Sequence, residues 1–350
     1  MTSDFILYLS LFLALTTLLP LIRHDFWIFR VFEYPRLQKL FLNALFIIAL
    51  LVWYFPLNLN TQIALAVLLL NMGYLLYQII PFTVFGKKEI VSSTKASNGN
   101  NVRLLIANVY QYNSKFDDYL ELIKSCDPDL ALFVETDSLW QQKLDKIKTD
   151  YPHTLSIPLA NTYGMLLYSK LALKNGSINY LVEDDIPSIE VDVELISGQM
   201  VKLFCLHPQP PVPQENPRST ERDKEILLVG KKAKNCNTPV IVIGDLNDVA
   251  WSYTTELFSK TSQLLDPRKG RGFYNSFNAK YFFLRFPLDH IFCSADFTLS
   301  SIKRMPSCGS DHFPMCVELQ YDPKAEAKND VPEATTEDKK LANEKINADT

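Results

Sequence analysis

The chain has 350 residues, of which 47% are hydrophobic and 21% are charged, and its formal net charge is −4. This composition excludes a disordered chain, a collagen and a small disulfide scaffold, and the acidic balance argues against a generally basic nucleic-acid-binding surface. The charge is unevenly distributed. Residues 1–86 carry four Lys or Arg and three Asp or Glu, whereas the remaining 264 residues carry 31 and 36. An apolar N-terminal part therefore precedes an ordinary soluble domain.

The N-terminal part has the pattern of a membrane anchor. Residues 5–22 form a run of 18 residues without a charge, and residues 40–86 form a run of 47, interrupted at Pro56. A helix needs about 20 apolar residues to cross the hydrocarbon core of a bilayer. Because backbone amides need partners inside lipid, such spans are helical. We predict three transmembrane α-helices, at 5–22, 39–55 and 61–82, within an anchor over residues 1–86 that inserts into a lipid bilayer through residues 5–82.

Two alternatives to this anchor are a cleaved signal peptide at 5–22 and a buried hairpin of a soluble protein at 39–82. The first is disfavoured because no Lys or Arg precedes the apolar run and no small-x-small cleavage site follows it. The unbroken apolar length of the other two runs disfavours the second.

The loop charges predict the orientation of the anchor. The loop after the first span is basic, the second loop has no charge, and two lysines follow the third span; the basic residues are Arg23, Arg30, Arg36, Lys39, Lys87 and Lys88. Positive loops stay in the cytoplasm, so we predict a cytoplasmic C-terminal domain and an external N-terminus. Cys205, Cys293 and Cys316 lie in strand-like runs, and we interpret them as small buried hydrophobic residues in a reducing compartment.

The remaining chain divides into three parts. The polar composition of residues 87–100 predicts a linker. Residues 101–320 are long enough for a folded domain with a large core. Residues 321–350 hold eight acidic residues and five lysines, and no aromatic residue follows Tyr321, so we predict a disordered polar tail.

Short β-type runs alternate with helical patterns in residues 101–320. Helices are predicted at 114–125, with Ser114 and Asp117 in a capping-box-like start, and at 218–234. This order, with several strand-to-strand steps, predicts an α/β domain built on mixed β-sheets. The predicted strands are 102–109, 129–134, 163–168, 189–195, 200–206, 239–243, 288–293 and 313–319.

Polar residues stand at the ends of several of these strands. The run Ile241-Val242-Ile243-Gly244-Asp245-Leu246-Asn247 leads from a buried strand to an Asp and an Asn two residues apart, a spacing that aims both side chains the same way. The alternative is a plain turn, because Gly-Asp and Asn-Asp suit turns.

Three further segments point to proton handling and metal binding. Asp289-His290 and Asp311-His312 each lie beside a strand, and a nearby carboxylate orients an imidazole and favours its charged form. Glu135 closes the apolar run 130–134. An acid in that position suits a hard cation such as Mg²⁺, which takes one or two carboxylates plus phosphate oxygens of a substrate.

Taken in order, these residues resemble the motifs of the endonuclease/exonuclease/phosphatase superfamily. The matching positions are Asn108, Glu135, His207, Gly244-Asp245-Leu246-Asn247, Asp289 and Ser310-Asp311-His312. The chain is most similar to bacterial membrane-anchored members, which implies an integral protein of the bacterial inner membrane. The resemblance covers residues 101–320 and implies two mixed β-sheets packed as a sandwich and flanked by helices.

The resemblance also implies roles for individual residues. Glu135, Asn108 and Asp311 correspond to the ligands of Mg²⁺, for which Mn²⁺ is a possible substitute. Asp245 corresponds to the base that activates water, and Asn247 and His207 to the groups that hold phosphate oxygens. His312 corresponds to the partner of the charge that develops on phosphorus, with Asp289 as its orienting carboxylate. His290 lies outside the pattern, and we interpret it as structural.

The implied function is a membrane-anchored, Mg²⁺-dependent phosphoesterase that hydrolyses a phosphodiester or a phosphomonoester by in-line attack of water. The alternative is a non-catalytic, membrane-tethered binding module that keeps the fold. The binding module is disfavoured because Glu135, Asp245 and His312 are all present.

The substrate class is open between lipid, nucleotide and nucleic acid. Residues 267–287 interleave basic and aromatic side chains, a pattern that suits base stacking, a lipid interface or simple packing. Arg271 and Arg285 from this segment, together with Tyr163, are predicted substrate contacts. Residues 87–320 carry a net charge of −2, and a tether raises the local concentration of lipid. Both features favour a phospholipid or a small phosphoester over duplex nucleic acid. The sequence predicts no oligomeric state.

Overall fold

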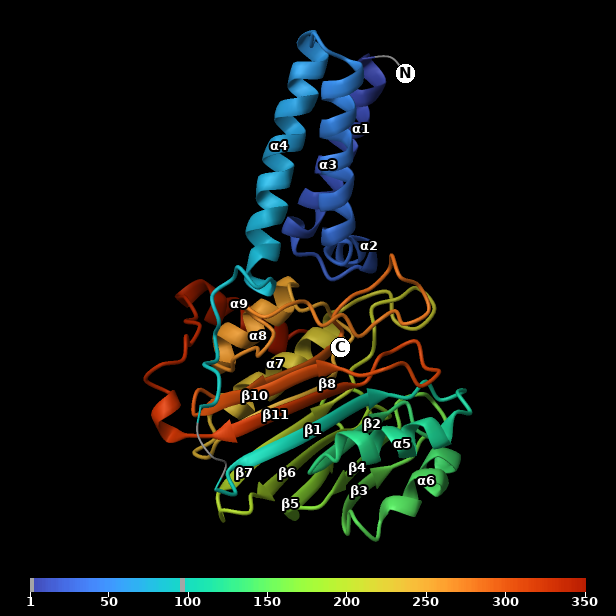
Figure 1. The fold of residues 1–350 in the computed structure, drawn as a ribbon, viewed down its shortest axis with the longest axis vertical. Helices are drawn as coiled ribbons and strands as arrows, with labels where there is room; N and C mark the ends of the chain where they lie inside the picture. Colours follow the sequence, from blue (N-terminus) through green and yellow to red (C-terminus); the bar gives the residue numbers. More distant parts are fainter. Residues whose placement is uncertain (1–2, 95–97) are drawn as a thin grey trace.

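The computed structural model describes residues 3–94 and 98–350, and its N-terminal part is a bundle of long helices. Helices α1, α3 and α4 stand side by side and project from the rest of the molecule (Figure 1). Three helical segments are long and apolar enough to cross a membrane, and they agree closely with the predicted spans: Asp4–Ile22, Arg36–Trp53 and Leu59–Phe82. The helices of this part, which we call the anchor after its predicted role, are α1 (Ser3–Leu18), α2 (Trp27–Arg30), α3 (Arg36–Trp53) and α4 (Leu59–Ile79).

A side-chain cap fixes the start of α4. A hydrogen bond between two asparagine side chains joins α4 to α3. The side chain of Asn58 accepts a hydrogen bond from the backbone N–H of Thr61, which caps the first turn. Inside the bundle, Asn71 Nδ2 of α4 donates to Asn43 Oδ1 of α3 at 3.1 Å. Such hydrogen bonds join helices in lipid, where apolar surfaces give no hydrophobic driving force between them.

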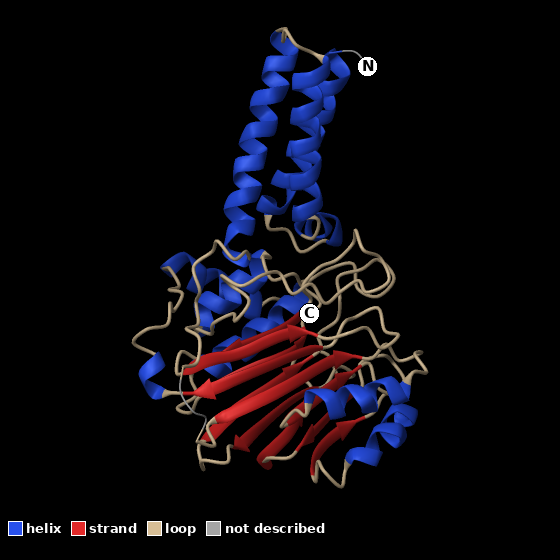
Figure 2. Cartoon of the chain, in the orientation of Figure 1, coloured by secondary structure: helices blue, strands red, loops and turns tan. Residues whose placement is uncertain are grey.

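The second part of the molecule is a four-layer sandwich of two β-sheets between two helical layers (Figure 2). The six-stranded sheet has the order β10-β11-β1-β2-β4-β3, and the five-stranded sheet has the order β5-β6-β7-β8-β9. The strands of the first sheet are β1 (Asn101–Asn108), β2 (Leu130–Val134), β3 (His153–Ile157), β4 (Met165–Ser169), β10 (Phe297–Arg304) and β11 (Met315–Tyr321). The strands of the second are β5 (Ala172–Asn179), β6 (Ser188–Glu194), β7 (Met200–Leu206), β8 (Val240–Asp245) and β9 (Asp289–Cys293).

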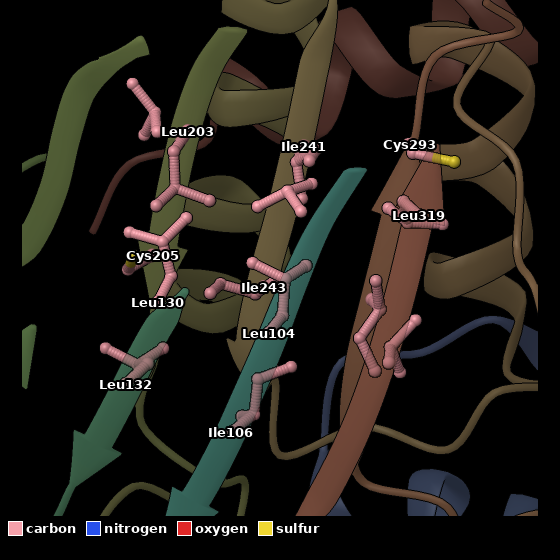
Figure 3. Close-up of a cluster of buried hydrophobic side chains, with 14 of the residues drawn as sticks. Leu104, Ile106, Leu130, Leu132, Leu203, Cys205, Ile241, Ile243, Cys293 and Leu319 are labelled. Carbon is pink, nitrogen blue, oxygen red and sulfur yellow. The ribbon is translucent and has the colours of Figure 1, made fainter. Parts of the chain in front are cut away.

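Both faces of each sheet are buried, which explains the continuous apolar runs in the sequence. Alternate residues of a strand point to opposite faces. In β1, Leu104 and Ile106 therefore enter the core between the sheets, whereas Leu105 and Ala107 pack under helices (Figure 3). The first sheet is covered by α5 (Phe116–Cys126) and α6 (Ser138–Leu144), and the second by α7 (Thr220–Lys234), α8 (Tyr253–Ser262) and α9 (Thr336–Ile346).

The eight predicted strands correspond to β1, β2, β4, β6, β7, β8, β9 and β11. The predicted fold class is confirmed: two mixed sheets flanked by helices. The strands that the sequence did not predict are β3, β5 and β10. Each of them is the terminal strand of its sheet. Edge strands are half solvated and carry fewer apolar residues, so they lack the continuous runs that marked the others.

The C-terminal tail is ordered, and the prediction of a disordered segment at 321–350 was wrong. Helix α9 packs against α7 and α8, with Ala342 buried and Leu341 beside it. The helix begins with a capping box between Thr335 and Asp338. Its Lys345 forms an ion pair with the buried Asp223 at 2.7 Å. The apolar stripe, the ion pair of Lys345 and the hydrogen bonds of Asn329 to the carbonyls of Ala295 and Phe297 hold this segment, although its overall composition is polar.

Three smaller predictions were also wrong. The segment predicted as a linker at 87–100 packs onto the domain where it is described, since Ile90 is buried and Ser92 pairs with Leu299 of β10; residues 95–97 lie outside the described residues. Helix α5 begins at Phe116 without a side-chain cap, so Ser114 does not cap it. Cys316 forms a disulfide with Cys126 instead of remaining free. The two cysteines are 190 positions apart, and the sequence gave no signal of this pairing.

The anchor contacts the sandwich through residues 23–35, which we call the docking loop. Arg30 Nη2 lies 3.1 Å from Asp223 Oδ2 at the start of α7, and both side chains are almost inaccessible to solvent. Trp251 Nε1 donates to the backbone carbonyl of Glu33 at 2.9 Å. A buried ion pair of this kind fixes geometry because removing either partner leaves an uncompensated charge. The docking loop is therefore part of the folded domain.

Candidate active site

The polar residues singled out in the sequence meet at one end of the two sheets. Asn108, Glu135, His207 and Asp245 stand at or just after the carboxyl ends of β1, β2, β7 and β8. Strand β1 is parallel to β2, and β7 is parallel to β8. Strand β9 runs antiparallel to β8, so its first residue, Asp289, pairs with Asp245. Strand topology alone thus gathers residues that are far apart in the chain.

Gly244 allows the carboxyl end of strand β8 to approach the neighbouring strand β7 closely. Its φ is +146°, and a Cβ at this position would lie 1.9 Å from the carbonyl oxygen of Leu206 in β7. Any side chain would therefore push the two strands apart. The close approach holds Asp245 beside His207, the residue that follows β7.

Asn108 links the carboxylates of the two sheets. Its Nδ2 donates to Glu135 Oε1 at 2.7 Å and to Asp245 Oδ2 at 3.0 Å. The two hydrogen atoms of one amide group thereby hold two acidic side chains that would otherwise repel each other. Asn108 is buried, so these bonds are strengthened by their low-dielectric surroundings.

Asp245, His312 and Asp289 form a line of alternating charge. His312 Nδ1 lies 2.8 Å from Asp289 Oδ2, and His312 Nε2 lies 3.5 Å from Asp245 Oδ2. Burial alone would lower the pKa of His312, but the carboxylates of Asp289 and Asp245 raise it to about 10. Burial raises the pKa of Asp245, and the charge of His312 opposes that shift. His312 is therefore an imidazolium at neutral pH.

His207 has the opposite protonation. It is buried 3.9 Å from Asp245 Oδ2, and burial lowers its pKa to about 4. The imidazole is neutral at pH 7, and its Nδ1 has no hydrogen-bond partner among the described residues. The ring of Tyr163 lies 5.4 Å from the ring of His207, so this predicted substrate contact borders the cluster. A neutral imidazole with a free ring nitrogen suits a substrate oxygen.

Asn247 and Asp311 complete the set of polar residues at this end. Asn247 has a φ of +50°, and its backbone N–H donates to Asp245 Oδ1 at 3.0 Å. Its side-chain amide donates to the carbonyl of Pro208 at 3.0 Å. The negative charge of Asp311 acts on both Glu135 and His312, so Asp311 shares their surroundings.

Two different groups of residues meet the general requirements of a metal site. Asp245, Asp289 and His312 offer ligand atoms within 4.8 Å of one another. Without a metal, the two carboxylates favour the protonated form of His312, whereas a metal needs the neutral imidazole. Glu135 lies beside this group, and burial raises its pKa to about 7. Within the described residues, Glu135 forms no ion pair with Lys or Arg.

Glu135, Asn108 and Asp311, the ligands expected from the sequence, form the second group. All three offer oxygen atoms, which Mg²⁺ prefers. Glu135 has the raised pKa of a carboxylate without a cationic partner, and a bound cation would supply that partner.

Of the two arginines predicted to contact substrate, one borders the cluster and the other does not. The guanidinium of Arg285 lies 4.9 Å from the ring centroid of Phe313, the residue after His312, so Arg285 borders the cluster. Arg271 does not reach the cluster. Its guanidinium donates to the carbonyls of Pro267 and Ile90, so it holds the segment after α4 in place. His290 is structural in this arrangement, since its ring nitrogens meet Arg268 and the carbonyl of Asp248.

Two residues missed in the sequence position the loop at Asn247 that follows β8. The backbone carbonyl of Asn247 accepts hydrogen bonds from Arg222 Nη1 at 2.7 Å and from the hydroxyl of Tyr34 at 2.9 Å. Tyr34 belongs to the docking loop, 213 residues away in the chain. No motif marks a side chain that binds a backbone carbonyl, so the sequence gave no signal for either residue.

Family comparison agrees with this geometry. The sequence profile of the Endonuclease/Exonuclease/phosphatase family matches residues 101–312, which is more than half of the chain. The chain therefore belongs to this family, whose members are metal-dependent phosphoesterases that include nucleases and phosphatases.

Solved structures share the fold at low sequence identity. D. rerio TDP2 complexed with single strand DNA product is 16% identical with a TM-score of 0.53, over 63% of this chain and 99% of that chain. The endonuclease/exonuclease/phosphatase from Beutenbergia cavernae DSM 12333 is 14% identical with a TM-score of 0.52, over 64% and 72%. The human Nocturnin catalytic domain with bound sulfate anion is 18% identical with a TM-score of 0.51, over 63% and 94%. No curated protein sequence matches the chain.

Substitution of Asp289 by Asn tests the charge on His312. The carboxylate of Asp289 raises the pKa of His312, so the imidazolium persists to high pH. In Asp289→Asn we expect the pKa of His312 to fall, so that activity is lost at a lower pH on the basic side. The pH profile of kcat/KM for a chromogenic phosphodiester measures this shift, with the exposed Asp117→Asn as control. An unchanged basic limb in Asp289→Asn would contradict the assignment.

Substitution of Tyr34 by Phe tests the contact between the anchor and the loop at Asn247. The change removes one hydrogen bond to Asn247 and leaves that of Arg222. A hydrogen bond contributes about 0.5–1.5 kcal/mol, so we expect kcat to fall by about two- to tenfold. Steady-state kinetics of the full-length chain measure it, and Tyr8→Phe, which alters an exposed tyrosine of α1, serves as control. Equal kcat values in both variants and wild type would show that the contact has no catalytic effect.

Proposed function

We propose that the chain is a membrane-anchored, Mg²⁺-dependent phosphoesterase that hydrolyses a phosphodiester or phosphomonoester by in-line attack of water activated by Asp245. The observation that carries this proposal is the buried line of Asp245, His312 and Asp289 beside Glu135. Burying such charges is costly unless they are paired, and clusters of perturbed carboxylates and imidazoles are typical of catalytic sites. Membership of the family and the three apolar helices support the same function.

Each polar residue of the cluster has a separate role in the proposed hydrolysis. Asp245 is held by Asn108 and by the backbone N–H of Asn247, so its free electron pairs can orient a water molecule and accept its proton. The imidazolium of His312 stabilises negative charge as the phosphorane forms, and Asp289 fixes its orientation. Neutral His207 and the side chain of Asn247 hold phosphate oxygens. Mg²⁺, held by Glu135, Asn108 and Asp311, would supply Lewis-acid stabilisation of the phosphate charge, and Mn²⁺ is the expected substitute.

Metal-dependent turnover of bis-p-nitrophenyl phosphate by the full-length chain tests this assignment. We expect activity with Mg²⁺ and none with EDTA. General acid–base groups contribute about 10²–10⁴-fold, so Asp245→Ala and His312→Ala should each lose about 100-fold or more. Glu135→Gln should raise the Mg²⁺ concentration needed for half-maximal rate. His153→Ala, which removes a histidine outside the cluster, should leave the rate unchanged.

Wild-type turnover that neither Asp245→Ala nor His312→Ala reduces would refute the roles given to these residues. Absence of turnover on every phosphoester, with the fold intact, would favour the alternative of a membrane-tethered binding module.

The surroundings of the cluster favour a substrate at the membrane surface. Residues 281–284 form an exposed apolar tip, with Phe282 and Phe283 the most exposed among them. Gln38, at the start of α3, donates to the carbonyl of Phe283 at 2.6 Å, so the tip lies beside the anchor. The same segment reaches the cluster, since the N–H of Ala279 donates to the carbonyl of Asp311 at 2.7 Å. Exposed aromatic side chains at this level suit a lipid interface.

A substrate panel tests this preference. We expect the full-length chain to hydrolyse a phospholipid or small phosphoester presented in mixed micelles faster than plasmid DNA or RNA, because the apolar tip and the anchor both place the cluster near lipid. The measured quantity is kcat/KM for each substrate with Mg²⁺, and Asp245→Ala supplies the background. A higher kcat/KM for nucleic acid would overturn the preference and leave the hydrolase assignment in place.

Membrane topology is the last part of the proposed function. The basic residues around the anchor favour an inner-membrane protein with its catalytic domain in the cytoplasm. The Cys126–Cys316 disulfide favours the other side, because disulfides persist in oxidising compartments. We expect a cytoplasmic reporter fused after Lys88 in a bacterial host to be active, and a periplasmic reporter at the same position to be inactive. The reverse pattern would overturn the orientation given by charge.

A further inference from the structure

A cavity of about 370 Å³ lies between the anchor and the sandwich, apart from the polar cluster. It is bounded by the domain-facing ends of α1, α3 and α4 and by α8, and these ends lie above α8 in Figure 1. Its volume is within the range of about 300–1,000 Å³ that small-molecule sites occupy. The wall is rich in basic side chains, which are Arg23, Arg36, Lys39, Lys260 and Lys269.

The acidic residues of the wall already have cationic partners. Glu256 pairs with Lys260 at 2.6 Å. Glu33 lies 3.4 Å from Arg30, and Asp266 lies 2.7 Å from Arg268. None of these carboxylates forms an ion pair with Arg36 or Lys39 within the part of the chain that the structure describes.

Arg36 and Lys39 are therefore buried cations that form no ion pair of their own within the described residues, and they share the charge of Glu33, which is already paired with Arg30. Arg36 is only 9% exposed, it lines the cavity, and its guanidinium forms no hydrogen bond to the described residues. Lys39 is 5% exposed, and its Nζ donates only to backbone carbonyls, those of Thr16 at 2.6 Å and Phe32 at 2.7 Å. Burying an unpaired charge is strongly unfavourable. The cavity is therefore suited to an anionic ligand at Arg36.

The position of the cavity points to the source of that anion. Leu21 at the end of α1 and Tyr77 near the end of α4 line it and are exposed on the outside of the anchor, at 56% and 77%. With the helices in a bilayer, these residues lie where headgroups meet acyl chains. A headgroup in the cavity would leave its acyl chains against the exposed apolar faces of α1 and α4. Basic pockets between transmembrane helices bind anionic lipid headgroups in this way.

We propose that this cavity binds the phosphate of an anionic glycerophospholipid from the surrounding leaflet. Arg36 donates charge-assisted hydrogen bonds to the phosphate oxygens, and Lys39 supplies a second cationic side chain. The lipid is bound between the anchor and the domain, and it is not the substrate. This site rests on the proposed insertion of the helices into a membrane, and it is independent of the proposed hydrolysis.

Native mass spectrometry of the full-length chain in an uncharged detergent tests the site. With phosphatidylglycerol added, we expect a one-to-one complex that phosphatidylcholine at the same concentration does not form. Loss of hydrogen bonds to a charged group costs about 1.5–3 kcal/mol, so Arg36→Gln should weaken binding about tenfold or more. Arg36→Lys should retain part of the binding. Lys87→Gln removes an exposed cation near the anchor but outside the cavity, and should bind like wild type.

Several outcomes would overturn the site. Equal binding of the two lipids by wild type, or equal binding of phosphatidylglycerol by wild type and Arg36→Gln, excludes a specific headgroup site. Inorganic phosphate that displaces the lipid at equimolar concentration shows a free-anion site instead. If Arg36→Gln does not fold, the contrast between the two lipids in wild type decides alone. Extraction of the chain without detergent would refute membrane insertion, whereas failure of hydrolysis leaves lipid binding unaffected.

Discussion

The burial of opposite charges around Asp245 is the constraint on which the rest of the structure depends. Two buried carboxylates, Asp245 and Asp289, and the imidazolium of His312 lie at the ends of the sheets, and each buried charge requires hydrogen bonds or an opposite charge. Asn108 and His312 meet that requirement from different parts of the chain. The positive φ angles of Glu135 and Asn247 add local strain at the same place. The extensive cores on both faces of each sheet supply the rigidity that holds these groups together.

The anchor takes part in this rigidity. A flexible tether would only keep the domain near a membrane, but the docking loop binds the sandwich through the buried pair of Arg30 and Asp223. The hydroxyl of Tyr34, in the same loop, donates a hydrogen bond to the backbone carbonyl of Asn247. The chain after α4 also packs onto the domain at Ile90. The helices and the loop at Asn247 are therefore joined by a few buried contacts.

Much of the site was visible in the sequence because of how buried strands are built. A continuous apolar run that ends in an acid or amide stands out, and Glu135 and Asp245 both follow such runs. The edge strands β3, β5 and β10 lacked this contrast and were missed, whereas the buried edge strand β9 was predicted. Contacts to backbone carbonyls, such as those of Arg222 and Tyr34, depend on tertiary structure and carry no local pattern. Polar composition led to two wrong predictions, a linker after α4 and a disordered tail. Arg271 holds the chain after α4 in place, and α9 packs through a narrow apolar stripe.

The arrangement of charge also limits where a metal ion can act. Two carboxylates stabilise the proton of His312, so a divalent cation directly beside it would compete with that proton. Glu135 lies on the other side of Asn108, joined to Asp245 only through the amide group. A cation at Glu135 and the imidazolium at His312 would thus flank Asp245 from two directions, each neutralising part of its charge. A phosphate between them would meet positive charge on both sides, and Asp245 would keep the free electron pair needed to accept a proton from water.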